Sequence, residues 1–154
     1  MSAPMDLTPY LQQNPLLQDF TEDGLRIIAS VCVPRQIEPG HPIFVSGLHG
    51  ESAFLLVAGE VLLTVDRPHG LRELAVLTAP DVFGELSLLK PGPRRVTARA
   101  RTQVGVIEIP RRDFMALQKQ RPQACMKLLM NVSERLGQRL AETGPLLDKL
   151  VDQL

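Results

Sequence analysis

The chain has 154 residues, and its 17 basic and 17 acidic side chains give a formal net charge of zero at pH 7. A protein that binds nucleic acid on its own usually carries a basic excess, because neutralisation of phosphates supplies most of its non-specific affinity, so the balanced charge argues against direct nucleic-acid binding. With 44% hydrophobic and 22% charged residues, the composition is that of one folded globular domain rather than a disordered chain.

Cysteine usage and the length of the apolar segments indicate where in the cell the protein is located. Cys32 and Cys125 lie far apart among apolar residues, which predicts two reduced core residues rather than a secreted disulfide framework. The N-terminus lacks the basic and apolar regions of a secretory signal. The most apolar stretch, residues 53–65, is interrupted by Gly59 and Glu60 and is too short to span a bilayer. We therefore expect a cytoplasmic protein without a membrane span.

Residues 1–35 have the pattern of short helices. Thr8-Pro9 is a helix start, and Thr21 followed by two acidic residues is a second. Apolar residues then recur at helical spacing, and Pro34 is expected to end the helix. These residues are Leu25, Ile28, Ala29 and Cys32.

Residues 36–110 change to short apolar and β-branched runs separated by closely spaced turn signals. The turn signals include Pro39-Gly40, Ser46-Gly47, His49-Gly50, Pro68-His69-Gly70, Pro80-Asp81 and Pro91-Gly92-Pro93. Short strands with turns at this density predict an antiparallel sandwich, barrel or jelly roll.

Residues 111–154 return to a helical pattern. A short helix is expected around residues 113–117, and Pro122 suits the first position of a longer one. Gly144-Pro145 is expected to break this longer helix. Apolar residues three and four apart form one stripe along it. The stripe comprises Cys125, Leu128, Leu129, Val132, Leu136 and Leu140.

The segment that carries chemistry is Phe83-Gly84-Glu85-Leu86. It reads as a strand end that turns at Gly84 into a short helix, whose free N–H groups favour a phosphate. Arg94 follows a Pro-Gly-Pro turn and can return over the same point with a guanidinium fork for anionic oxygens. Glu85 is placed to accept hydrogen bonds from hydroxyls beside that phosphate.

Strand alternation selects Arg94 over its neighbour Arg95 as the inward-facing arginine. In an extended segment Arg94 shares a face with Val96, Ala98 and Ala100, while Arg95 shares the other with Thr97, Arg99 and Arg101. The face that carries the small apolar residues is predicted to point into the fold. An arginine buried there would be costly without an anion to pair with.

These residues resemble the phosphate-binding cassette of the cyclic nucleotide-binding domain family, here residues 83–98. The resemblance extends over about residues 16–140 and includes Ile43-Phe44-Val45-Ser46-Gly47 and the strand pair around Gly59. It implies a mainly β fold: an antiparallel β-roll (jelly roll, double-stranded β-helix) at 36–110, short N-terminal helices at 1–35 and a C-terminal helical tail at 111–154.

The resemblance also implies a ligand, cAMP or cGMP, and a role for each cassette residue. Glu85 is expected to bind the ribose 2′-hydroxyl and Arg94 the cyclic phosphate, with help from the backbone of Gly84 and Leu86. The remaining ligand-binding candidates of the cassette are Ser87, Arg95 and Val96.

Arg95 departs from the family pattern, which usually has alanine, serine or threonine after the cassette arginine. A second guanidinium could add a phosphate contact or crowd the pocket, and the sequence leaves both open. Serine or threonine at this position favours cGMP in the family, so Arg95 gives no support for cGMP and cAMP stands only as the default.

In this family the last helix covers the purine. Arg135 and Arg139 are one turn apart and flank the apolar stripe, and Thr143 follows one turn later. These three are the candidate base contacts, against the alternative of a solvated helix face.

Two other function classes stay open. The fold could serve as an interaction or dimerisation scaffold without nucleotide, and His49 with Glu51 resembles half of a cupin metal motif in a β-roll metalloenzyme. No nucleophile elbow, Cys/His catalytic pair or P-loop is present, so we expect no enzyme, no metal site and no cofactor.

Partners follow from the length and the stripe. Residues after Pro122 suffice for one helix and a short extension, which predicts a stand-alone sensor without a DNA-binding domain. The stripe on the last helix predicts contact with a second copy or a partner protein.

Overall fold

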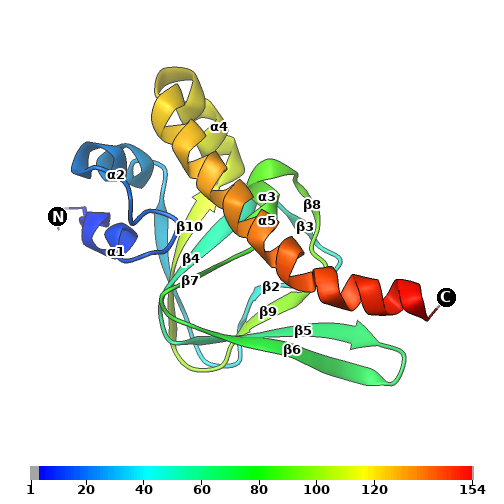
Figure 1. Cartoon of the computed structure of the whole chain (residues 1–154). Helices are drawn as coiled ribbons and strands as arrows, with labels where there is room; N and C mark the ends of the chain where they lie inside the picture. The colour runs from blue at the N-terminus through cyan, green and yellow to red at the C-terminus, as the bar shows by residue number, and fades with distance from the viewer. Residues whose placement is uncertain (1–3, 154) are drawn as a thin grey trace.

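The computed structural model describes residues 4–153 and consists mainly of two antiparallel sheets flanked by helices (Figure 1). The first sheet has the order β1 (Val33–Ile37), β10 (Val104–Pro110), β4 (Ser52–Ala58) and β7 (Asp81–Phe83). The second has the order β2 (Pro42–Phe44), β9 (Thr97–Ala100), β5 (Glu60–Arg67) and β6 (Gly70–Thr78). A short ribbon pairs β3 (His49–Gly50) with β8 (Gly92–Pro93).

Helices precede, interrupt and follow the strands. α1 (Thr8–Gln12) and α2 (Glu22–Ala29) come first, and the single turn α3 (Leu86–Leu89) follows β7. α4 (Arg111–Gln120) and α5 (Pro122–Asp152) close the chain, and α5 touches α2, α3 and α4. The predicted β-roll with short N-terminal helices and a C-terminal helical tail is thereby confirmed.

The first sheet is buried on both faces, which explains the nearly continuous apolar run of β4. Phe54 and Leu56 point toward the second sheet, whereas Ala53 and Leu55 point toward the helices. The helix-side core is the larger of the two. It includes Leu11, Leu17, Ile28, Ile107, Ile109, Phe114, Cys125, Leu128 and Val132.

The predicted start of α2 is confirmed, and its predicted end is wrong. Thr21 is the N-cap, and its Oγ1 accepts a hydrogen bond from the Gly24 N–H at 3.1 Å. The helix ends at Ala29, however, and Pro34 lies inside β1, which begins at Val33 rather than at residue 36. Proline is tolerated there because β1 is an edge strand, which has a hydrogen-bonded neighbour on one side only.

The predicted break at Gly144-Pro145 is also wrong, because α5 continues through both residues. Pro145 has no N–H for the carbonyl four residues earlier, and its ring crowds that carbonyl. These effects can bend a helix without ending it. Figure 1 shows that α5 changes direction toward its C-terminal end, which projects beyond the sheets.

Both cysteines are free, in agreement with the prediction that they are reduced. Cys125 is fully buried in the helix-side core. Cys32 is half-buried, and its thiol donates to the Ile28 carbonyl at 3.2 Å. Burial raises the pKa of Cys32 to about 12, so the thiol stays neutral at physiological pH. Separately, none of the helices within residues 4–153 has the length and apolarity to cross a membrane.

Candidate functional site

A cavity of about 380 Å³ opens between the β7–α3 turn, the segment after β8 and the β5–β6 pair. The sequence predicts seven cassette residues at the ligand site, and all seven line this cavity. Its lining comprises Gly84, Glu85, Leu86, Ser87, Arg94, Arg95 and Val96, with Phe44, Leu63, Ala75, Leu77, Val82, Phe83, Lys90, Gly92, Pro93 and Arg139. The β-roll therefore brings the predicted cassette to one concave surface.

Gly84 forms the predicted turn between strand and helix. Its φ of +69° is unfavourable for residues with a side chain, and a Cβ at this position would lie 2.8 Å from Nη1 of Arg94. Hydrogen bonding of α3 begins with the Ser87 N–H, which donates to the Gly84 carbonyl at 3.2 Å. The turn thus allows both the change of direction and the close approach of the arginine.

Arg94 is only 9% exposed and forms part of the cavity wall. Its Nη1 donates to Ser87 Oγ at 2.8 Å and its Nη2 to the Ser52 carbonyl at 2.7 Å, while the guanidinium lies 4.1 Å from the ring centre of Phe44. The buried Nε has no hydrogen-bond partner.

The hydrogen-bond acceptors of Arg94 are all uncharged, so no carboxylate within ion-pair distance neutralises it in the described part of the chain. Burial lowers its pKa below the ordinary value for arginine, and the more distant Glu108 opposes this. Arginine stays protonated in proteins. A buried cation in a cavity wall with only uncharged acceptors is therefore arranged for an anion.

The predicted burial of Arg94 and exposure of Arg95 are confirmed, but the extended segment expected from Arg94 begins only at Thr97, after a bend at Arg95 and Val96. Arg95 and Arg99 are exposed, whereas Ala98 and Ala100 are buried between the sheets. Thr97 is the exception, because it is buried on the side expected to face solvent. Its Oγ1 accepts a hydrogen bond from the Ser46 N–H at 3.0 Å. A neighbouring loop therefore covers this position.

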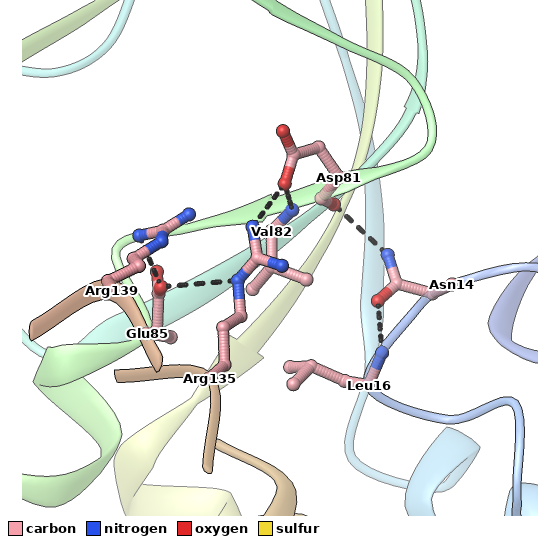
Figure 2. Close-up of polar contacts among 7 residues, drawn as sticks. All are labelled: Asn14, Leu16, Asp81, Val82, Glu85, Arg135 and Arg139. Carbon is pink, nitrogen blue, oxygen red and sulfur yellow. Dashed lines mark hydrogen bonds and ion pairs between the residues drawn. The ribbon is translucent and has the colours of Figure 1, made fainter. Parts of the chain in front are cut away.

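Glu85 is 3% exposed and is held by the last helix (Figure 2). Arg139 donates through Nη1 to Oε1 at 2.8 Å, and the Nε of Arg135 lies 3.6 Å from the same oxygen. The contacts found for this carboxylate all go to Oε1. Glu85 therefore faces the cavity with Oε2 available to hydroxyl groups.

The three candidate base contacts differ in their position relative to the cavity. Arg139 lines the cavity, whereas Arg135 and Thr143 do not. Arg135 instead forms an ion pair with Asp81 at the start of β7, as Figure 2 shows. Thr143 is exposed, and its hydroxyl donates to the carbonyl of Leu140 in its own helix at 2.6 Å.

The wall behind Arg94 includes residues to which the sequence pattern assigns no role. Phe44 stacks on the guanidinium, Ser52 accepts from it, and a Cβ on Gly50 would lie 2.0 Å from its Nε. These residues are about 40 to 50 positions from Arg94, so no local spacing could have indicated them. The adjacent Pro39-Gly40 and Ser46-Gly47 signals mark only turns.

The histidine and glutamate that resemble half a metal motif pair with each other. His49 Nε2 lies 2.9 Å from Glu51 Oε1, and both side chains are largely exposed. Within residues 4–153 no three His, Cys, Asp or Glu side chains converge as metal ligands. This geometry gives the metalloenzyme hypothesis no observation in its favour.

Comparison with known proteins agrees with the cassette. The family model of the cyclic nucleotide-binding domain matches residues 34–121, more than half of the chain. Glutaminase 1 of Bradyrhizobium diazoefficiens is 32% identical over 143 residues, which is 93% of this chain and 23% of that protein. The cyclic AMP receptor protein of Thermus thermophilus is 30% identical over 91% of this chain and 63% of its own length.

A solved structure supports the same assignment of fold. The N-terminal domain of a transcriptional regulator from Streptomyces coelicolor superposes with a TM-score of 0.76 at 27% identity, covering 87% of this chain and 94% of that one. The chain spans less than two thirds of the length of the curated relatives named above. The similarity is therefore to one domain of longer proteins.

Proposed function

The chain belongs to the cyclic nucleotide-binding domain family, and from this premise we propose that it is a regulatory module that binds cAMP, with cGMP as the alternative ligand. The Thermus thermophilus relative is named a cyclic AMP receptor protein, which favours cAMP as the first ligand to test. The module binds its ligand without transforming it. The part shared with glutaminase covers 23% of that enzyme, and we assign it a regulatory rather than a catalytic role.

One observation carries the proposal: the guanidinium of Arg94 is buried in the wall of the cavity and has only uncharged hydrogen-bond acceptors. A cyclic phosphate supplies the missing negative charge and accepts charge-assisted hydrogen bonds. The backbone of Gly84 and Leu86 and the hydroxyl of Ser87 border the same point. Arg95 and Val96 complete the lining, with Arg95 at the solvent side.

The sugar and the base occupy the rest of the cavity in this proposal. Glu85 accepts a hydrogen bond from the ribose 2′-hydroxyl through Oε2, while Oε1 keeps its hydrogen bond from Arg139. The base then lies toward α5, where Arg139 reaches it. Thr143 becomes a base contact only if the C-terminal part of α5 moves over the cavity, because its hydroxyl is bonded within α5.

Signalling in this proposal is a shift of α5. A ligand shifts an equilibrium only if it binds the two states unequally, and contacts with Glu85 and Arg139 supply that difference. A coupling of about 1–3 kcal/mol changes partner affinity about 5- to 150-fold. The partner is a protein or a second copy of the chain, bound through α5, and no direct contact with nucleic acid is involved.

Isothermal titration calorimetry with cAMP and with cGMP tests the proposal. We expect micromolar binding of at least one nucleotide. Replacing Arg94 by alanine should cost about 2–3 kcal/mol, or about 30- to 150-fold in Kd, because a charge-assisted contact is lost. Arg72→Ala is the matched control, since this exposed arginine of β6 is outside the cavity lining and should leave Kd unchanged. Absence of heat with both nucleotides would refute the sensor and favour the scaffold.

A further inference from the structure

The last helix is tied to the β7–α3 segment at two points (Figure 2). Glu85 forms an ion pair with Arg139 of α5, and Asp81 forms an ion pair with Arg135 one helical turn earlier. The two acids are four residues apart and flank the turn, so the guanidinium groups match them in spacing. Only the Glu85 and Arg139 pair belongs to the cavity lining.

Asp81 does not line the cavity, and contacts within the protein hold it. It lies in β7, where it is paired with Leu56 of β4. Its backbone carbonyl accepts a hydrogen bond from Asn14 Nδ2 at 3.0 Å, and its own Oδ1 accepts from the Val82 N–H at 2.7 Å. Asn14 is 1% exposed, and its Oδ1 accepts from the Leu16 N–H at 3.1 Å. The backbone of Asp81 is therefore held by a strand and by the N-terminal segment, and its carboxylate contacts the Val82 N–H and Arg135.

Glu85 is placed differently, since it follows Gly84 in the turn before α3. A ligand that contacts Glu85 therefore acts directly on the second tie and reaches the first only through Arg135. Arg135 joins the two ties, because it pairs with Asp81 while its buried Nε lies 3.6 Å from Glu85 Oε1 without a hydrogen bond.

We propose that Asp81 and Arg135 form a ligand-independent anchor that positions α5 so that Arg139 reaches Glu85 at the cavity. Both are positioning residues and neither contacts the nucleotide. The part of α5 beyond Arg139 is then the part that responds to ligand, while Arg135 is its fixed point. The inference rests on the proposed function for its affinity effect, but the anchor itself exists without nucleotide.

The ion pair is suited to this role by its intermediate burial. The side chains of Asp81 and Arg135 are 24% and 23% exposed, so the pair is screened less than a surface pair and avoids the cost of complete burial. Loss of one partner should weaken cAMP binding about fivefold to tenfold, between the values for exposed and fully buried pairs.

The test compares Asp81→Asn, Arg135→Gln and Arg135→Lys in the full chain, with calorimetric titration of cAMP and hydrogen exchange of α5 without nucleotide. We expect the first two variants to raise Kd about fivefold to tenfold and to speed exchange from residue 132 onward. Arg135→Lys keeps the charge and should recover most of the affinity. Glu85→Gln should speed exchange mainly beyond residue 139, because Asp81 still holds Arg135.

Asp19→Asn is the matched control, because Asp19 also ties α5 to a distant segment, through Lys127 at 3.7 Å and Asn131 at 3.0 Å. It should leave Kd unchanged. Equal Kd values for Asp81→Asn and the wild type, or unchanged exchange in α5, would overturn the anchor. If the wild type binds no nucleotide, the proposed function fails, and the exchange comparison still decides whether the anchor exists.

Discussion

At the residue scale, the site is organised around a buried cation. Arg94 is covered by Phe44 and approached closely by the backbone of Gly50 and Gly84, so its guanidinium has little freedom. Fixing such a group before the ligand arrives avoids an entropic cost on binding. The alternation of the strand predicts its inward direction, whereas the residues that hold it come from β2, β3 and β4.

Gly84→Ala tests this close approach. A Cβ would lie 2.8 Å from Arg94 Nη1, and we expect the displaced guanidinium to weaken cAMP binding about tenfold or more. Gly40→Ala is the matched control, since Gly40 also has a positive φ, of +86°, but nothing lies within 4 Å of its Cβ position. Both variants should lose about 1 kcal/mol of stability from backbone strain. Equal Kd values for the two would contradict the role given to Gly84.

At the scale of elements, capping chemistry predicts where helices begin better than proline predicts where they end. Thr21 starts α2 as its sequence context predicts. Pro145, a helix breaker by local rules, lies within α5 because that helix bends instead of stopping. The apolar stripe of α5 behaves likewise: Cys125, Leu128 and Val132 pack into the core of the same chain, so this part is not free for a partner.

The N-cap of α2 gives a prediction at this scale. Thr21→Ala removes the acceptor for the Gly24 N–H and should cost about 1 kcal/mol of unfolding free energy. For a domain of this size the melting temperature should fall by about 2–4 °C in calorimetry. Thr21→Ser keeps the hydroxyl and should melt close to the wild type. A melting temperature unchanged in Thr21→Ala would show that the cap contributes nothing.

At the scale of the whole molecule, the cavity couples parts of the chain that are distant in sequence. Asp81 and Arg135, like Glu85 and Arg139, are separated by 54 residues and meet because α5 packs beside the first sheet and α3. Large apolar residues on the outer side of α5 are exposed, and they are the surface that we propose for a partner. They are Met126, Met130, Leu140 and Val151.

The oligomeric state tests that surface. If a second copy covers it, multi-angle light scattering should give twice the chain mass, and Met130→Glu should shift the protein toward the monomer by placing a charge in an apolar contact. Met115→Glu on α4, which also replaces an exposed methionine, should leave the mass unchanged. A monomer at the highest soluble concentration of the wild type would exclude the homodimer.

The sequence by itself determined the order of elements and the turn at Gly84, because turn chemistry and hydrophobic patterning act over a few neighbouring residues. It also predicted the burial of Arg94, although the strand on which that prediction relied begins only at Thr97. The tertiary structure decided the rest. It placed Phe44 on Arg94, separated Arg139 from Arg135 and Thr143 at the cavity, and paired Asp81 with α5. These contacts join residues about 40 to 54 positions apart; strand pairing in the β-roll brings Phe44 to Arg94, and the packing of α5 brings Arg135 and Arg139 to their partners.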